Sequence, residues 1–388
     1  MKRKLIRTST VPMSLKTLLK GQLHFFSENG FEVIGVSSQG NDLEEVAKNE
    51  GIKTIPVNMA RRIAPIQDLK SLWNLWILFR KEKPTIVHSI TPKAGLLSML
   101  AAKIAGVPIR IHTFTGLIFP TQTGIMQKIL ILMDRLLCWA ATNIYPEGNG
   151  VKQDLINYKI TSKPLKVIAN GNVNGIDLAF FSPTEISENQ KVELKQQLGI
   201  QPDDFVFVFV GRLVGDKGIN ELVEAFSTLN INNVKLLLVG PMEQELDPLK
   251  TETLQKIQTN PSILSVGFQK DVRPYFAISD ALAFPSYREG FPNVVMQAGA
   301  MELPCIVSNI NGCNEIIIEN ENGLIVPSKQ TKALQKAMKQ LIEDKDLYLR
   351  LKQNSRRMIV ERYEQSVVWE AILQEYNYHI SIYNNKKK

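Results

Sequence analysis

The stretch FVFVFVGRLVGDKGINELVEAF, from Phe205 to Phe226, contains the pattern on which the fold prediction rests. Phe205–Val210 is an unbroken apolar run, which is typical of a parallel strand covered on both faces. A glycine-rich loop follows, and apolar residues then recur at helical spacing over Ile219–Leu229. The stretch therefore predicts one strand–loop–helix unit of a doubly wound α/β sheet, with its loop at the carboxyl end of the strand.

The same alternation of strands and helices extends along the chain and predicts the α/β class. Further strands are expected over Lys4–Ser9, Phe31–Ser37, Lys53–Val57, Thr85–Ser89, Ile109–His112, Val234–Val239, Ile263–Val266, Ala281–Phe284, Cys305–Ser308 and Gly323–Val326. Further helices are expected over Leu15–Asn29, Leu43–Asn49, Ile66–Lys81, Lys93–Ala105, Lys332–Asp344, Leu347–Glu361 and Val367–Ile380.

The length of 388 residues exceeds what one hydrophobic core usually serves, so two domains are expected. Gly171–Pro183 is dense in Gly and Asn at its start and is the expected connection. We expect two Rossmann-like domains, over residues 1–180 and 181–366, that face each other across a ligand cleft. A helix near residues 367–382 is expected to pack back on the first domain.

The charge is unevenly distributed along an otherwise ordinary globular composition, with 44% hydrophobic and 22% charged residues. The net charge is +8, and residues 1–190 contain 23 Lys and Arg against 14 Asp and Glu. A basic half indicates an anionic partner such as a phospholipid surface, a lipid diphosphate or nucleic acid. The chain has no zinc-finger spacing, RNP-like motif or basic heptad region, which disfavours nucleic acid. A solvated basic surface without a specific partner remains the alternative.

The rare residues exclude several classes of site and point to a compartment. Three cysteines without metal-ligand spacing indicate a reducing compartment, and four unpaired histidines argue against a structural metal. The basic N-terminus has no apolar run behind it, so a cytoplasmic protein without a secretory signal is expected. No Gly-x-Gly-x-x-Gly motif follows the first strand and no Walker-type loop is present, so no nicotinamide, flavin or other cofactor is expected.

The apolar stretch Ile125–Ala141 is too short and too often interrupted by charge to span a bilayer. Lys128, Asp134 and Arg135 interrupt it. Two interpretations fit: a helix buried in the core, which is favoured, or a helix at a membrane interface, to which Trp139 and the two cations would contribute.

The residues that indicate chemistry gather in two loops at strand ends. One is the loop Gly211–Gly218, which contains Arg212 and Lys217, and the other lies in SYREGFPNVVMQAGAMELP, from Ser286 to Pro304, which contains Glu289. Two cations suit a diphosphate, and a carboxylate suits the hydroxyls of a sugar. Together they predict a nucleotide-sugar site, against the alternative of solvated surface charges.

A helix expected to open at Asn293 would add a phosphate seat to this site. Asn is a good N-cap, and the free amides that follow, beginning with Val294, carry partial positive charge. Gln297, one turn further on, would reach a nucleoside ribose. Alternatively, Gln297 is a polar residue on a half-buried helix face.

Two strand ends in the first half also carry polar residues. His112 would hydrogen-bond a sugar hydroxyl or assist proton transfer, although a structural histidine fits as well. In the turn His88-Ser89-Ile90-Thr91-Pro92-Lys93, Lys93 would take an acceptor phosphate, or be a lysine exposed in a turn.

These segments form a collinear set that resembles the retaining glycosyltransferases of family 4, which have the two-domain GT-B fold. The segments are STVPMSLKTLLKGQ, HSITPKAGLLSMLAAKIAG, HTFTG, VNGIDLAFF, VGRLVGDKGINELVEAF, VGFQKDV and PSYREGFPNVVMQAGAMELPCIVSNINGCNEII. The chain is most similar to the bacterial subgroup that extends undecaprenyl-diphosphate-linked sugars, which includes N-acetylgalactosaminyltransferases.

The resemblance implies a metal-independent transfer from a UDP-sugar, as co-substrate, to a polyprenyl-diphosphate-linked saccharide at the inner face of the cytoplasmic membrane. It implies that Arg212 and Lys217 hold the donor diphosphate and that Glu289 contacts the donor sugar. The other implied site residues are His112 beside the reacting sugar, Phe268, Phe291, Asn293, Val294, Gln297, Met13 and Ser14 around the donor, and His88, Thr91 and Lys93 toward the acceptor.

Two positions depart from the family pattern. The second glutamate of the family's E-x7-E motif is Gln297 here, which retains hydrogen bonding but has no charge. The glycines usual in the N-terminal phosphate loop are replaced by Pro12-Met13-Ser14. Two other functions remain open: a nucleotide-sugar epimerase of the same fold, and a non-catalytic nucleotide-sugar-binding protein.

Overall fold

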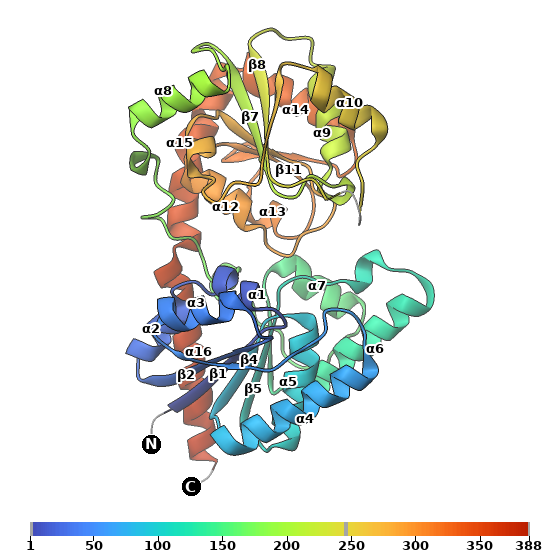
Figure 1. Ribbon diagram of the computed structural model, residues 1–388, viewed down its shortest axis with the longest axis vertical. Coiled ribbons are helices and arrows are strands. Elements are labelled where there is room, and N and C mark those ends of the chain that lie inside the picture. Colours follow the sequence, from blue (N-terminus) through green and yellow to red (C-terminus); the bar gives the residue numbers. More distant parts are fainter. Residues whose placement is uncertain (1–2, 244–246, 387–388) are drawn as a thin grey trace. The chain divides into compact units, whose positions relative to one another are not determined.

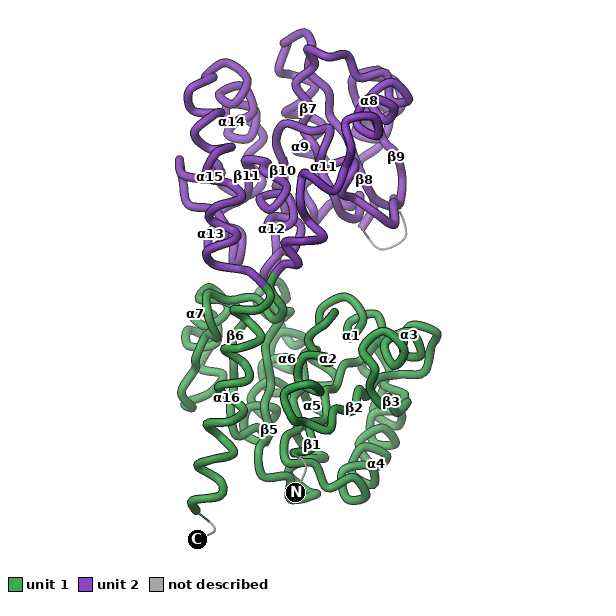
Figure 2. Tube along the Cα trace, turned by 90° about the vertical axis from the view of Figure 1, so that its left-hand side faces the viewer, with its two compact units in different colours: residues 1–175, 365–388 green, residues 176–364 purple. Residues whose placement is uncertain are grey.

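The computed structural model describes residues 3–243 and 247–386 and contains two compact units. Unit 1 comprises Met1–Gly175 and Gln365–Lys388, and unit 2 comprises Ile176–Glu364 (Figure 2). Each unit has a six-stranded parallel sheet covered by helices (Figure 1). This architecture confirms the prediction of two doubly wound α/β domains. The first division falls at Gly175, earlier than the expected boundary at residue 180.

The sheet of unit 1 has the order β3-β2-β1-β4-β5-β6. Its strands are β1 (Arg3–Thr8), β2 (Phe31–Ser37), β3 (Lys53–Pro56), β4 (Ile86–Ser89), β5 (Ile109–Phe114) and β6 (Asn143–Pro146). The order reverses between β1 and β4, which is where doubly wound sheets place their ligands. Strand β6 was not predicted, because its four residues lack a strong strand pattern.

Two helical layers cover this sheet because successive side chains of a strand point to opposite faces. Leu5 lies in one hydrophobic cluster and Ile6 in the other. The Leu5 side is covered by α1 (Pro12–Leu18), α2 (Gln22–Glu28), α3 (Asn41–Glu50) and α16 (Gln365–Asn385). The Ile6 side is covered by α4 (Pro65–Glu82), α5 (Pro92–Ile104), α6 (Gly124–Ala140) and α7 (Asn149–Asn157).

The single helix expected over Leu15–Asn29 is wrong, because the chain forms α1 and α2 with a break at Gly21. Gly21 has a φ of 79°, in the left-handed region that favours glycine. A Cβ at this position would lie 2.7 Å from the ring of Trp369 on α16. The break therefore serves the close packing of α16, which the local sequence does not reveal.

The favoured interpretation of Ile125–Ala141 as a buried core helix is also wrong. The stretch forms α6, but its buried residues are Leu137, Cys138 and Ala140. The large apolar side chains exposed on it are those of Ile125, Met126, Ile129, Leu132, Leu136 and Trp139. No helix within the described ranges combines the length and the apolar character needed to cross a membrane.

A buried polar network fastens α16 to the sheet of unit 1. The Tyr376 hydroxyl accepts a hydrogen bond from Arg7 Nη1 at 2.8 Å and lies 2.6 Å from His88 Nδ1. His88 Nε2 lies 2.8 Å from Thr113 Oγ1. Burial, followed by the charge of Arg7, lowers the pKa of His88 well below its usual value, so the imidazole is neutral.

Unit 2 repeats the doubly wound plan with the order β12-β11-β10-β7-β8-β9. Its strands are β7 (Phe205–Val210), β8 (Val234–Val239), β9 (Ile263–Gly267), β10 (Ala281–Phe284), β11 (Cys305–Ser308) and β12 (Gly323–Val326). Its helices are α8 (Glu188–Gln197), α9 (Ile219–Ser227), α10 (Thr251–Thr259), α11 (Arg273–Ala277), α12 (Asn293–Ala300), α13 (Cys313–Ile316), α14 (Thr331–Glu343) and α15 (Lys345–Tyr363). Helices α8, α10, α11 and α13 were not anticipated, and their short or polar sequences explain why.

Tyr376→Phe is expected to destabilise the protein by about 1–3 kcal/mol, because it leaves buried hydrogen-bonding groups of Arg7 and His88 without this partner. Tyr378→Phe on the same helix is the matched control, since the Tyr378 side chain is exposed. Urea unfolding of both variants measures the difference. Equal free energies of unfolding for Tyr376→Phe and Tyr378→Phe would contradict a stabilising role for the network.

Candidate active site

The two loops that carry the predicted donor residues are held together by a backbone contact in unit 2. Gly218 has a φ of 72°, and a Cβ there would lie 2.1 Å from the carbonyl oxygen of Pro285. The Tyr287 amide donates to the Asp216 carbonyl at 2.8 Å, which fastens the same two loops a second time. The loop after β7 and the loop after β10 therefore meet, which a single site built from both loops requires.

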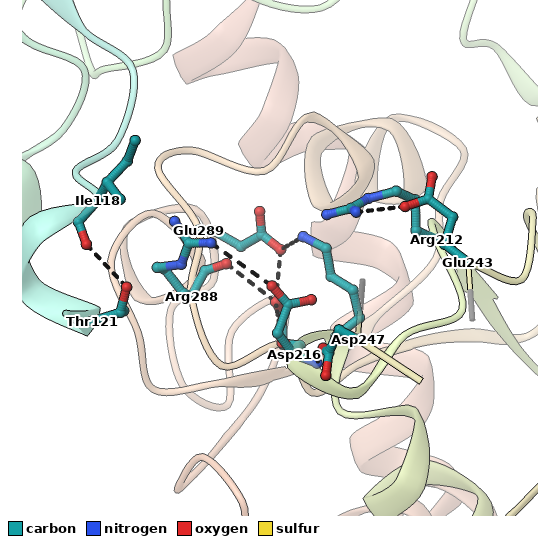
Figure 3. Close-up of polar contacts among 10 residues, drawn as sticks. Ile118, Thr121, Arg212, Asp216, Glu243, Asp247, Arg288 and Glu289 are labelled. Atoms are coloured by element: carbon teal, nitrogen blue, oxygen red, sulfur yellow. Dashed lines mark hydrogen bonds and ion pairs between the residues drawn. The ribbon is translucent and has the colours of Figure 1, made fainter. Parts of the chain in front are cut away.

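Lys217 and Glu289 form an ion pair where these loops meet (Figure 3). Ser286 Oγ donates a second hydrogen bond, of 2.7 Å, to the same oxygen, Glu289 Oε1. Both side chains of the ion pair are mostly buried, with 16% and 15% exposed. Glu289 Oε2 accepts no hydrogen bond from the described residues. The carboxylate is thus fixed by one oxygen and presents the other.

Arg212 lies in the same loop but is half exposed and pairs with a carboxylate that the sequence analysis missed. Arg212 Nη1 donates to Glu243 Oε2 at 2.9 Å. Glu243 follows β8, the strand next to β7, so its proximity depends on strand order rather than on local sequence. A phosphate at Arg212 would have to displace or share this carboxylate.

Asp216 and Asp247 shape the loop around the two cations (Figure 3). Asp247 Oδ2 accepts the Asp216 amide at 2.5 Å, and a Cβ on Gly215 would lie 2.8 Å from Asp247 Oδ1. Arg288 lies 3.8 Å from the Asp216 carboxylate and adds a third cation. The roles of Asp216, Asp247 and Arg288 could not be predicted from the sequence, because they depend on contacts between loops.

The helix expected to open at Asn293 is α12, but the prediction of Asn293 as its N-cap is wrong. Pro292 occupies the cap position, and Asn293 is the first residue of the helix. Pro292 has extended backbone, with φ −74° and ψ 110°, so the helical dihedral angles begin at Asn293. Val294 is half-buried, and its amide lies in the first turn, where amides lack helical partners.

Three further predicted donor residues differ in exposure. Phe268 follows β9 and is 74% exposed, which leaves its ring available to a base. Phe291 is buried, with its ring centroid 5.5 Å from that of Tyr363, so its side chain belongs to the core. Gln297 is half-buried, and its side chain makes no hydrogen bond to the described residues.

His112 lies at the end of β5 in unit 1 and is buried. Its Nδ1 lies 2.8 Å from Ser89 Oγ, and a Cβ on Gly95 would lie 2.5 Å from its Cε1. Burial lowers the pKa of His112 to about 3, so the imidazole is neutral at physiological pH. Its Nε2 makes no hydrogen bond to the described residues.

The predicted acceptor residues all have hydrogen-bond partners within unit 1. Both ring nitrogens of His88 are engaged in the network with Tyr376, and Thr91 Oγ1 accepts the Thr10 amide at 2.8 Å. Lys93 is buried rather than exposed, and its Nζ donates to Asp68 Oδ2 at 2.5 Å and to the Arg62 carbonyl at 3.0 Å. The alternative of a lysine exposed in a turn is wrong, because Asp68 of α4 reaches Lys93. Binding of an acceptor phosphate by Lys93 stays a prediction.

Lys93 instead forms part of the wall of a pocket in unit 1. The pocket encloses about 600 Å³, counting the solvent at its mouth. Its walls are mostly apolar, and its lining residues are Arg61, Ile63, Pro92, Lys93, Leu96, Phe114, Gly116, Leu117, Ile118, Leu130, Met133 and Asp134. Phe114 connects it to the site of His112, because the two rings pack edge to face with centroids 4.5 Å apart.

Met13 and Ser14 were expected in a turn but lie in the first turn of α1. Pro12 begins this helix, and the Ser14 amide donates to the Val11 carbonyl at 3.0 Å. Met13 is exposed.

Among the described residues, no group of three or more His, Cys, Asp or Glu is arranged to hold a metal ion.

Comparison with known proteins identifies the two halves of the chain. Residues 20–173 match the family model of glycosyltransferase family 4, and residues 190–358 match that of glycosyl transferases group 1. In fold, the chain is similar to the crystal structure of HepE from Anabaena in complex with UDP and glucose. The TM-score is 0.81 at 17% identity, covering 97% of this chain and 99% of that one.

Two curated bacterial relatives match over most of their length. The chain is 34% identical to the capsular polysaccharide biosynthesis glycosyltransferase CapM of Staphylococcus aureus, over 97% of each protein. It is 31% identical to the UDP-Gal:alpha-D-GlcNAc-diphosphoundecaprenol alpha-1,3-galactosyltransferase of Escherichia coli, over 78% of this chain and 77% of that protein. With both domain models matched in order, the chain belongs to the family 4 glycosyltransferases and has their GT-B fold.

Proposed function

We propose that this chain is a retaining glycosyltransferase that moves a hexose or N-acetylhexosamine from a UDP-sugar to a polyprenyl-diphosphate-linked saccharide. The observation that carries the proposal is the cluster in which Lys217 and Ser286 hold one oxygen of Glu289. The capsular and undecaprenol-linked relatives support a role in bacterial surface polysaccharide or glycan biosynthesis. Such an acceptor would bring the enzyme to the cytoplasmic face of the membrane.

On the donor side, Arg212 and Lys217 would stabilise the negative charge that develops on the departing diphosphate. Fixed cations in a partly buried site stabilise such charge more than water does. The amides at the start of α12 would add partial positive charge. Glu289 Oε2 would accept a hydrogen bond from a sugar hydroxyl, and Phe268 would border the base.

His112 would bind a sugar hydroxyl rather than act as a general acid. A general acid works best with a pKa near the operating pH, whereas burial holds the pKa of His112 at about 3. Ser89 fixes the ring through Nδ1, which leaves Nε2 for the substrate. Retention would then follow from attack on the same face, assisted by the leaving phosphate, as the family resemblance implies.

On the acceptor side, the apolar pocket beside Lys93 would receive the part of the acceptor next to its saccharide. Arg61 and Lys93 both line this pocket and would meet an acceptor phosphate, with Lys93 exchanging its partner Asp68 as the donor cations exchange theirs. We propose that protein cations rather than a bound metal ion neutralise the donor, since three of them lie in two adjoining loops.

The deciding experiment screens UDP-, GDP-, ADP- and TDP-sugars by thermal shift, with and without EDTA. Transfer to a lipid-diphosphate saccharide is then measured, and the anomeric configuration of the product is read by NMR. We expect stabilisation by one UDP-sugar, EDTA-resistant transfer and a retained configuration. An altered sugar formed without acceptor would identify an epimerase, and binding without any turnover would identify a non-catalytic protein.

Lys217→Met and Glu289→Gln are each expected to lower kcat/KM for the donor by about 10²–10³-fold, because each removes a charge placed against the reacting groups. The matched control is the exposed ion pair between Lys256 and Glu224 on α10 and α9, changed to Met and Gln. Steady-state transfer kinetics provide the measurement. Wild-type kcat/KM in Lys217→Met would overturn the donor assignment.

Gln297→Ala is expected to raise the donor KM by about two- to tenfold with kcat nearly unchanged, because one hydrogen bond to the ribose contributes roughly 0.5–1.5 kcal/mol. Gln297→Glu keeps an acceptor at the same reach and should retain a KM close to that of the wild type. If Gln297→Ala leaves KM unchanged, Gln297 has no contact with the donor and is only a polar residue on the face of α12.

A further inference from the structure

The outer face of α6 presents a continuous apolar stripe. Ile125, Ile129, Leu132, Leu136 and Trp139 recur at alternate spacings of four and three, so they lie along one side of the helix. All five are exposed, including 66% of Leu132 and 59% of Trp139. The side chains that fasten α6 to the core, such as Leu137 and Cys138, lie between them in sequence.

Exposed apolar side chains concentrate on α4, α5 and α6 of unit 1. Of the 23 large apolar residues exposed in the described part of the chain, 11 lie on these three helices. Helix α5 packs against both α4 and α6, so the three helices form one layer (Figure 1). α4 contributes a second exposed row, of Ile66, Leu69, Trp73 and Ile77. Isolated exposed apolar residues are ordinary, but such a concentration marks an interaction surface.

The charges on the stripe helix are mostly positive. α6 contains Lys128 and Arg135 against one carboxylate, Asp134. Burial raises the pKa of Asp134 to about 7, so even this group is partly neutral at physiological pH. Lys103 Nζ lies 4.1 Å from the centroid of the Trp139 ring, which places a cation directly at the stripe. The surface therefore complements an apolar layer with anionic groups at its edge.

We propose that the α6 stripe docks on an anionic phospholipid bilayer, with α6 lying along the interface. Its apolar side chains enter the boundary between headgroups and acyl chains, and its flanking cations contact lipid phosphates. This inference rests on the proposed function in one respect, because a lipid-linked acceptor lies in a membrane. It extends that function by naming the surface that makes the contact.

A second copy of this chain is the rival occupant, since apolar residues at spacings of four and three also suit helix pairing. Paired helices of that kind are flanked by charges of both signs. In a pair of α6 helices, Lys128 and Arg135 of each copy would be opposed by a single carboxylate, Asp134. Like charges brought together in this way disfavour a dimer and favour an anionic surface.

The test measures flotation of the full-length protein with vesicles of phosphatidylcholine, with and without phosphatidylglycerol. We expect binding to the anionic vesicles that weakens as salt increases. Leu132→Gln combined with Trp139→Gln should reduce this binding by at least about tenfold, because both apolar contacts are lost. The matched control is Val192→Gln combined with Leu349→Gln, which changes two exposed apolar residues of unit 2 and should bind as the wild type does.

Other outcomes overturn the proposal. If the α6 variant binds vesicles as well as the wild type, the stripe is not the docking surface. If sedimentation without vesicles reveals a dimer that the α6 variant loses, the stripe is an interface between copies. Transfer to a short-chain, water-soluble acceptor separates this inference from the proposed function. This transfer should survive in the α6 variant, because the acceptor needs no membrane. If the wild type does not transfer sugar to this acceptor, the proposed function is contradicted and membrane docking is not.

Discussion

The close approach of Gly218 to the Pro285 carbonyl is the constraint on which the donor side of unit 2 depends. Any side chain at residue 218 would push the loop after β7 away from the loop after β10. Lys217 would then lose the position from which it reaches Glu289. The parallel order β10-β7-β8 places these strand ends side by side, and the glycine allows the final contact between backbones.

The charges of this site are balanced before any ligand arrives. Lys217 pairs with Glu289, Arg212 with Glu243, and Arg288 lies near Asp216. The cations therefore do not remain as isolated, partly buried charges, which would be costly. A diphosphate that enters must displace these carboxylates from the cations. Each cation therefore contributes less binding free energy than an unpaired cation would. In return, the side chains are already oriented by the pairs that they form.

Much of the fold follows from the sequence, because strands covered on both faces require apolar runs such as Phe205–Val210, and the helices between them follow the 3.6-residue period. The donor loops could be recognised for the same reason, since parallel strand ends share one edge. The predictions that failed concern side chains whose partners come from distant segments of the chain. Asp68 captures Lys93, Tyr376 engages His88 from the far end of the chain, and Glu243 reaches Arg212 from the neighbouring strand. Periodicity also cannot tell which side of α6 faces the core.

The two-segment composition of unit 1 gives the protein an order of assembly. Val368, Ile372, Tyr376 and Ile380 of α16 belong to the core of unit 1, although the first 175 residues supply the rest of it. During synthesis, unit 2 leaves the ribosome complete while the unit made first still lacks a helix over one face of its sheet. The N-terminal segment must therefore wait, partly uncovered, until residues 365–388 have been made, and chains released before that point would expose apolar surface that attracts chaperones and proteases.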